Sequence, residues 1–342
     1  MLVRDIGEFG VIARLNGMLS QRAPDNRAVR DLPLLVDTGD DTAVWQTGSA
    51  RELFTTDTMV EDIHFTRETT PWRDLGWKAV AANISDVASM GGLPTYALVT
   101  LGLTPETEVA DIEEMYRGML DIGDEYGMAI VGGDIVGSPV FFVTTALMGV
   151  CDCDPLLRSN ARPGDLVAVS GYVGSSGGGL KLMLESPVVT GDAADYLRSA
   201  HRRPRPAVAQ GRMLSEAGIT TAMDVSDGLA DDLSKLCSAS GVAARIRAGE
   251  VPVHPLLRRA FPHDCLGLAL GGGEDYVLLF TGPATVVEPL VPHLGEGSAV
   301  IGTIESVKGA SQAGNVFLVS ESGDEMLLSG SGWDHFQAAN SG

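Results

Sequence analysis

Six short motifs in this sequence place an aspartate beside glycine or a small hydroxyl residue. They are Thr38-Gly-Asp-Asp41, Thr55-Thr-Asp-Thr58, Asn83-Ile-Ser-Asp86, Gly132-Gly-Asp134, Asp224-Val-Ser-Asp-Gly228 and Gly272-Gly-Glu-Asp275. Glycine lets the backbone approach a ligand closely, and short carboxylates at strand ends can converge on one point. Mg²⁺ prefers such hard oxygen ligands, and a cation offsets the repulsion between gathered carboxylates. The motifs therefore predict a site for divalent cations.

Each motif also has a purely structural interpretation. Asp, Ser and Gly are frequent in turns and at helix N-caps, and Asp227 could simply cap the helix that follows it. Six such motifs in one chain make this interpretation weaker for the set than for any single member.

Phosphate binding has two candidate elements and no Walker sequence. The glycine-rich segment 171–179 leads from a strand to a helix and offers backbone N–H groups, but it lacks the G-x-G-x-x-G spacing and could equally be a structural turn. Arg158 is a candidate to offset the charge of a triphosphate, with an ordinary surface arginine as the alternative.

Nucleophilic hydrolase chemistry finds little support. The chain has no G-x-S-x-G elbow, and its histidines form neither an H-x-x-H nor an H-E-x-x-H arrangement. The six are His64, His201, His254, His263, His293 and His335. Most of them are expected to be structural.

Composition and periodicity indicate a mixed α/β chain of two domains. A length of 342 residues exceeds what one core usually covers. Strand-like and helix-like segments alternate, with helices expected over 74–90 and 107–126 and strands over 96–103 and 166–170. The polar stretch after residue 150, rich in proline and glycine, predicts a boundary that separates domains 1–150 and 151–342.

The charge balance excludes some partners. The formal net charge is −21, which disfavours nucleic acid, although it could mean only a well-solvated acidic surface. No apolar run reaches the roughly 18–20 residues that span a bilayer, so we expect a cytoplasmic protein without a membrane partner. The cysteines are expected to be reduced and buried, and Cys151-Asp-Cys153 is the one pair spaced for a metal or redox role.

Taken in order, the motifs resemble the thiamine-monophosphate kinase family. The aspartate motifs are shared with the wider superfamily that includes aminoimidazole ribonucleotide synthetase and selenophosphate synthetase. The segment Asp57-Thr-Met-Val-Glu-Asp-Ile-His64-Phe65, the Gly-Gly-Glu274-Asp-Tyr276 motif and the tail Trp333-Asp-His-Phe336 are more particular to the kinase. The resemblance runs from Gly7 to Phe336.

The resemblance implies a two-domain α/β subunit whose amino-terminal domain binds metal and ATP and forms a β-barrel with a second copy in a homodimer. The implied reaction is phosphorylation of thiamine monophosphate by ATP with several Mg²⁺ ions. The implied metal ligands are Asp41, Thr55, Thr56, Asp57, Asp86, Asp134, Asp224 and Asp227. The implied nucleotide contacts are Tyr116, Gly133, Arg158 and Ser226, and the implied substrate contacts are His64, Glu274 and Trp333.

This reaction requires neither a Walker lysine nor an obvious catalytic histidine, and the sequence has neither motif. A monophosphate acceptor is already ionised at neutral pH, so direct in-line transfer needs charge neutralisation more than a catalytic base. Trp333 could stack on a cationic ring or could anchor the tail in the core. Ser175-Ser-Gly-Gly-Gly179 and Val277 depart from the residues usual in the family. Another phosphate acceptor, or a regulator that binds ATP without turnover, remains an alternative.

Overall fold

The computed structural model describes residues 51–185, 188–307 and 309–328, together with short pieces before residue 51. Among those pieces, β1 (Leu34–Val36) and β2 (Val44–Trp45) pair antiparallel. Asp41 and Trp333 lie outside the described residues. The chain divides into two compact units, residues 1–155 with 202–212 and residues 156–201 with 213–342.

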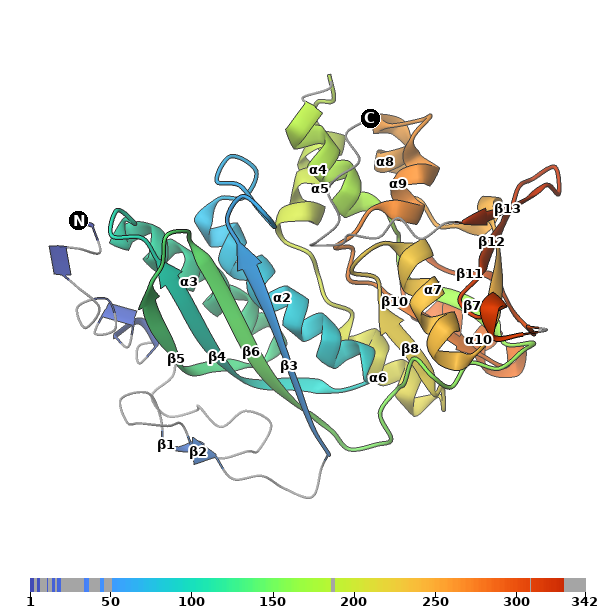
Figure 1. Cartoon of the computed structure of the whole chain (residues 1–342), viewed down its shortest axis with the longest axis horizontal. Helices are drawn as coiled ribbons and strands as arrows, with labels where there is room; N and C mark the ends of the chain where they lie inside the picture. Colours follow the sequence, from blue (N-terminus) through green and yellow to red (C-terminus); the bar gives the residue numbers. More distant parts are fainter. Residues whose placement is uncertain are drawn as a thin grey trace. The chain divides into compact units, whose positions relative to one another are not determined.

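Unit 1 is built on a four-stranded sheet with the order β3-β6-β4-β5. Its strands are β3 (Arg51–Val60), β4 (Leu93–Leu103), β5 (Ala129–Gly137) and β6 (Phe142–Cys151). β4 and β5 are parallel, and the other neighbours are antiparallel. Two helices, α2 (Trp72–Ser89) and α3 (Val109–Tyr126), lie on one face of this sheet (Figure 1). The sequence predictions of a helix in each of these segments are confirmed.

Glycines let α2 and α3 approach each other closely. A Cβ on Gly76 of α2 would lie 1.8 Å from the Met115 carbonyl oxygen, and one on Gly118 of α3 would lie 1.8 Å from the Arg73 carbonyl oxygen. Apolar side chains such as Ile84 and Ile112, each 0% exposed, fill the space around this contact. The two helices therefore form a rigid cover over their side of the sheet.

The opposite face of the same sheet is open in the subunit. Its exposed apolar side chains include Phe54, Leu98 and Val136, which are 69%, 43% and 40% exposed. The described residues form an open sheet rather than a closed barrel, with β3 and β5 at its edges. The two-domain mixed α/β architecture is as predicted, and the shared barrel remains a prediction that requires a second copy.

Unit 2 contains a seven-stranded sheet with the order β13-β12-β9-β11-β7-β10-β8. Its strands are β7 (Leu166–Ser170), β8 (Thr221–Asp224), β9 (Ala243–Arg247), β10 (Leu278–Gly282), β11 (Ser298–Glu305), β12 (Val316–Val319) and β13 (Glu325–Leu328). All neighbours are antiparallel except β9 and β12. The strand predicted over 166–170 is confirmed with the same bounds.

Helices pack around this sheet. They are α4 (Ser175–Glu185), α5 (Asp192–Arg202), α7 (Leu229–Ser240), α8 (Pro255–Ala260), α9 (Cys265–Gly271) and α10 (Ala284–Leu290). A further helix, α6 (Val208–Glu216), spans the boundary between the two units at 212/213. The core of the unit includes Val167 and Val169 of β7, Leu233 of α7 and Leu279 of β10, each 0% exposed. The first half of the glycine-rich segment is a loop, and α4 begins within it at Ser175.

The segment 202–212 belongs to unit 1 although the flanking sequence belongs to unit 2. The Trp77 indole N–H donates to the Pro204 carbonyl oxygen at 2.7 Å, and the Arg202 guanidinium donates to the Thr69 carbonyl oxygen at 2.7 Å. The partition predicted from the sequence made each domain one continuous stretch, whereas the chain returns to unit 1 through this segment.

Candidate functional site

In unit 1, alternation along β3 sorts the predicted ligands onto the two faces of the sheet. Asp57 is paired in register with Thr145, which is 0% exposed beneath the helices. Thr55 lies two residues before Asp57 and therefore on the same face. Its hydroxyl bonds to the Asp86 carboxylate of α2, with 2.5 Å between the oxygens. The structure thus brings Thr55 and Asp86 together and places Asp57 on the same side.

Thr56 and Asp134 belong to rows that alternate with this one. Asp134 pairs in register with Thr100, Thr100 with Thr144, and Thr144 with Thr58. The hydroxyls of Thr58 and Thr144 are 2.8 Å apart. Asp134 is exposed, and its carboxylate accepts the N–H of Ile135 at 3.0 Å. Asp134 is therefore one row away from Asp57 and on the opposite face of the sheet, so the subunit does not bring these two carboxylates together.

Gly133, a predicted nucleotide contact, is a glycine for a reason within the sheet. A Cβ at this position would lie 1.9 Å from the Val99 carbonyl oxygen of the neighbouring strand. Any side chain here would push β5 away from β4 and displace Asp134, the next residue.

In unit 2, a buried carboxylate shapes the loop between β8 and α7. Asp232 is 0% exposed and accepts the backbone N–H groups of Ser226, Asp227 and Gly228 at 2.9, 2.9 and 3.2 Å. Burial raises the pKa of Asp232 to about 6 against the opposing effect of these bonds and of Lys235. Gly228 occupies the N-cap of α7, so the interpretation of Asp227 as the helix cap is wrong.

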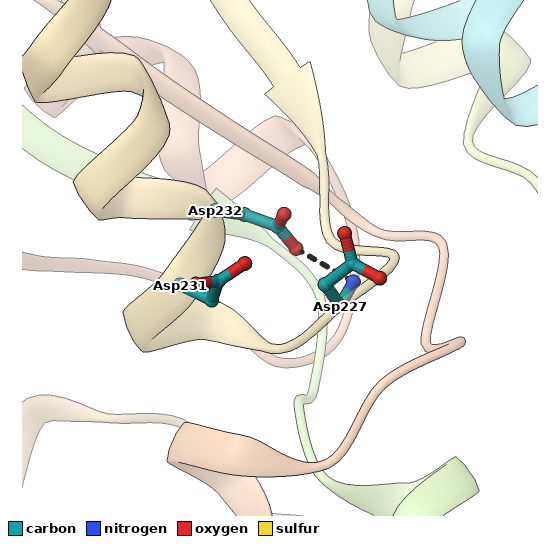
Figure 2. A group of neighbouring side chains, drawn as sticks. All are labelled: Asp227, Asp231 and Asp232. Carbon is teal, nitrogen blue, oxygen red and sulfur yellow. Dashed lines mark hydrogen bonds between the residues drawn. The ribbon is translucent and has the colours of Figure 1, made fainter. Parts of the chain in front are cut away.

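Asp227 belongs to a group of three carboxylates, Asp227, Asp231 and Asp232, which Figure 2 shows at the start of α7. One oxygen from each lies within 4.8 Å of the others, and no other such group of three metal-binding side chains occurs among the described residues. The Lys235 ammonium pairs with Asp227, with Asp231 at 2.6 Å and with Asp232 at 3.1 Å. A metal ion bound by these three carboxylates would have to displace the Lys235 ammonium. Asp224, at the end of β8, is 6% exposed.

The loop before β10 lies against this loop. The Glu274 N–H donates to the Ser226 carbonyl oxygen at 2.8 Å, and a Cβ on Gly273 would lie 2.6 Å from the same oxygen. Glu274 and Tyr276 adopt φ values of 63° and 52°, a conformation that costs a non-glycine residue about 1 kcal/mol or more. The predicted substrate contact Glu274 is thus adjacent to the predicted nucleotide contact Ser226.

His201, for which the sequence predicted no role, lies next to Glu274. His201 is 3% exposed, and its Nδ1 lies 3.5 Å from Glu274 Oε2 and 3.1 Å from Ser176 Oγ. Ser176 itself is 1% exposed. Only tertiary structure brings these residues together, so no local spacing in the sequence indicated them.

The amino terminus of α4 is occupied by a side chain of the protein. The Asp275 carboxylate accepts the N–H groups of Gly174 and Ser176, the latter at 2.9 Å. Burial raises the pKa of Asp275 to about 7 despite these bonds. Of the two interpretations of the glycine-rich segment, the structural turn is therefore the one that the structure supports.

The remaining predicted contacts are His64, Tyr116 and Arg158. His64 Nδ1 accepts the Val60 N–H at 3.0 Å, so the neutral imidazole carries its proton on Nε2. Tyr116 on α3 is 5% exposed, and burial raises the pKa of its phenol. Arg158 is exposed, and its carbonyl oxygen accepts the Ser240 hydroxyl at 2.9 Å. Their roles stay predictions.

Comparison with known proteins gives a consistent result. Residues 39–151 match the AIR synthase related protein, N-terminal domain, and residues 162–328 match its C-terminal domain. The thiamine-monophosphate kinase of Bacillus subtilis (strain 168) is 34% identical over 316 residues, covering 91% of this chain and 96% of the relative. The chain belongs to the thiamine-monophosphate kinase family.

Further members of the thiamine-monophosphate kinase family extend the match. The Escherichia coli (strain K12) relative is 35% identical over 339 residues, covering 96% of this chain and 98% of its own. A solved structure described as AaThiL complexed with AMPPCP and TMP superposes with a TM-score of 0.74 at 29% identity, covering 98% of this chain and 99% of that one. Within the described residues, no helix is long and apolar enough to cross a membrane.

Proposed function

We propose that this chain transfers the γ-phosphoryl group of ATP to thiamine monophosphate, which yields ADP and thiamine diphosphate. The observation that carries the proposal is the similarity to thiamine-monophosphate kinases over nearly the whole chain. The contact between the Glu274 and Ser226 loops supports it, because one predicted substrate residue and one predicted nucleotide residue are neighbours in unit 2.

The acidic residues supply oxygen ligands of the kind that Mg²⁺ prefers. Thr55, Asp57 and Asp86 of unit 1 would hold such ions from one side of the sheet, and Asp224 and Asp227 would do so in unit 2. Asp41 is proposed as a further ligand, and Thr56 and Asp134 would hold ions from the opposite, open face of the sheet. When bound, the ions neutralise phosphate charge and align the reacting groups.

The other side chains bind and orient the two substrates. The acceptor phosphate is ionised at neutral pH, so it can attack the γ-phosphorus in line without losing a proton to the protein. His64 presents its Nε2 proton as a donor for an anionic group. Glu274, which His201 holds at 3.5 Å, presents a carboxylate that suits the cationic ring of thiamine. Trp333 would stack on the same ring.

Nucleotide binding is proposed for the remaining predicted residues. Ser226 presents its side chain from a loop that Asp232 holds rigid. Arg158 is exposed and can approach a triphosphate. Gly133 shapes the strand that carries Asp134. Tyr116 is buried in the subunit, so its contribution would come through packing unless its ring turns outward.

We also propose a homodimer formed through the open face of the four-stranded sheet. The face bears Phe54, Leu98 and Val136, apolar side chains that a monomer would leave in water. Two such sheets packed face to face would bury these side chains and form the β-barrel implied by the family resemblance.

The proposed reaction is tested by incubating the purified protein with ATP, Mg²⁺ and thiamine monophosphate and separating the products by chromatography. We expect equal amounts of ADP and thiamine diphosphate. Parallel reactions with other phosphate acceptors, and without acceptor, measure selectivity and idle ATP hydrolysis. A folded protein that binds ATP but forms no thiamine diphosphate would refute the assignment, and ADP release with another acceptor would redirect it.

A further inference from the structure

Two cysteines meet where β6 ends in unit 1. Cys151 is the last residue of β6, and the chain bends at Asp152 and Cys153. In a continuing strand, residues two apart are separated by roughly 6.6–7 Å along the chain. Because of the bend, the Sγ atoms of Cys151 and Cys153 are only 3.3 Å apart.

Arginines hold this bend in place. Arg51, which pairs with Cys151 in register, donates to the Cys153 carbonyl oxygen at 2.9 Å and to the Asp154 carboxylate at 2.6 Å. Arg212 forms an ion pair with Asp152, the residue between the two cysteines. Three consecutive residues are thus tied to arginine side chains, which keeps the thiols facing each other.

The two thiols differ in their access to solvent. Cys151 is 0% exposed, and its Sγ contacts the Cys153 carbonyl oxygen at 3.3 Å. Cys153 is partly exposed. Burial raises the pKa of the Cys151 thiol, which disfavours its thiolate. Cys153 is therefore the thiol that a reagent from solution meets first.

We propose that Cys151 and Cys153 are a modification site that forms a reversible intramolecular disulfide by exchange with a low-molecular-weight disulfide. The Cys153 thiolate attacks one sulfur of the small disulfide, which expels one small thiol and leaves a mixed disulfide. Cys151 then loses its proton and attacks Cys153 Sγ, which expels the second small thiol. The protein loses two electrons and two protons, and the small disulfide gains them.

Closing the disulfide alters the contacts of the bend. The sulfurs must move from 3.3 Å to about 2.05 Å, and the Cβ–S–S–Cβ dihedral must approach about 90°. Cys153 and the Asp152 carboxylate shift with this movement, so the pairing with Arg212 changes. Asp152 and Arg212 both lie within a few residues of points where the chain passes between the two units, at 155/156 and 212/213.

The test uses the full chain, equilibrated with reduced and oxidised glutathione in varied ratio, then acid-quenched and alkylated. All four cysteines are thiols in the structure. We expect loss of two alkylatable thiols in one step, a loss of two hydrogens from the peptide that holds both cysteines, and full recovery after dithiothreitol. The readout is a thiol count, so it is independent of the kinase activity proposed above.

Single variants separate the two cysteines from the rest. Cys153→Ser replaces the partly exposed thiol and is expected to abolish the loss, whereas Cys151→Ser is expected to stop at a mixed disulfide on Cys153. Cys265→Ser, a buried cysteine elsewhere, is the matched control and should still lose two thiols. Retention of all four thiols by the folded wild-type chain in excess oxidised glutathione would overturn the proposal. A loss that persists in Cys153→Ser or maps to Cys237 or Cys265 would overturn it as well.

Discussion

The two sheets of this protein position their site residues in different ways. In unit 1, regular elements carry them: Thr55 and Asp57 project from β3, and Asp86 projects from α2. In unit 2, loops carry Ser226 and Glu274, and buried side chains outside the predicted set hold those loops. Alternation along a strand fixes the direction of its side chains. In a loop, by contrast, each buried backbone N–H group outside the sheet needs a hydrogen-bond acceptor, such as the Asp232 carboxylate. Variants on the strand and helix of unit 1 should therefore act by removing charge, and variants behind the loops of unit 2 should act by changing the position of a site residue.

The largest expected effect comes from the predicted metal ligands on β3 and α2 of unit 1. Asp86→Asn keeps the shape of the side chain and removes its charge, so we expect kcat for thiamine diphosphate formation to fall by about 100-fold or more. Asp154→Asn, an exposed carboxylate of the same unit, is the control and should stay within about twofold. Wild-type kcat in Asp86→Asn would remove this residue from the site.

The open face of the same sheet gives the next largest effect. Phe54→Lys places a charge where the proposed dimer buries an apolar ring, and we expect the dimer dissociation constant to rise by about 100-fold. Sedimentation velocity over a range of concentrations measures the change. Leu184→Lys, at a side chain 64% exposed on α4, should leave the dimer intact. A Phe54→Lys protein that associates like the wild type would place the interface elsewhere.

The loop side is tested by His201, which we expect to position Glu274. His201→Leu removes the imidazole whose Nδ1 lies 3.5 Å from Glu274 Oε2. We expect KM for thiamine monophosphate to rise by about 10-fold, which corresponds to about 1.4 kcal/mol. KM for ATP should stay within about twofold. His201→Asn keeps a polar group near the Nδ1 position and should recover part of the loss, and His263→Gln at an exposed histidine should change nothing. Equal rises in both KM values would indicate a general loss of structure.

The last prediction concerns stability rather than activity or association, through its dependence on pH. Burial raises the pKa of Asp275 to about 7 in the folded chain from its ordinary value of 3.8. The folded state thus keeps a proton that the unfolded chain has lost. This contribution to stability is fully present below about pH 4 and is lost as the pH rises through about 7, with a slope of at most about 1.4 kcal/mol per pH unit.

Asp275→Asn removes the titration, and its single amide oxygen can accept one of the two N–H groups, of Gly174 or Ser176, that the two carboxylate oxygens accept. We expect the free energy of unfolding, measured by urea denaturation from pH 4.5 to 8, to vary less with pH than in the wild type. An Asp264→Asn variant at an exposed carboxylate serves as the control. Identical pH profiles for Asp275→Asn and wild type would contradict the assigned pKa.

Regular elements were largely predictable from the sequence. The period of apolar residues gave α2 and α3 to within a few residues, and the short run Leu166–Ser170 gave β7. The adjacency of Ser226 and Glu274 agrees with their joint placement in the predicted site. These features depend on local periodicity or on short motifs, and both can be recognised in the sequence itself.

The anchors were not predictable, because their partners are distant in sequence. Asp275 and the terminus of α4, or His201 and Glu274, meet only after β7, β8 and β10 have paired. A glycine-rich loop before a helix has the same pattern whether a phosphate or a carboxylate of the protein fills its N–H groups.

The return of residues 202–212 to unit 1 has a practical consequence for dissecting the protein. A fragment that ends at residue 150 would lack the Pro204 carbonyl oxygen to which the Trp77 indole donates. It would also lack Gly211, which packs closely against Ala88 of α2. The other fragment would carry residues 202–212 without the part of unit 1 that they contact. A fragment of unit 1 intended to keep these contacts must therefore include residues 202–212.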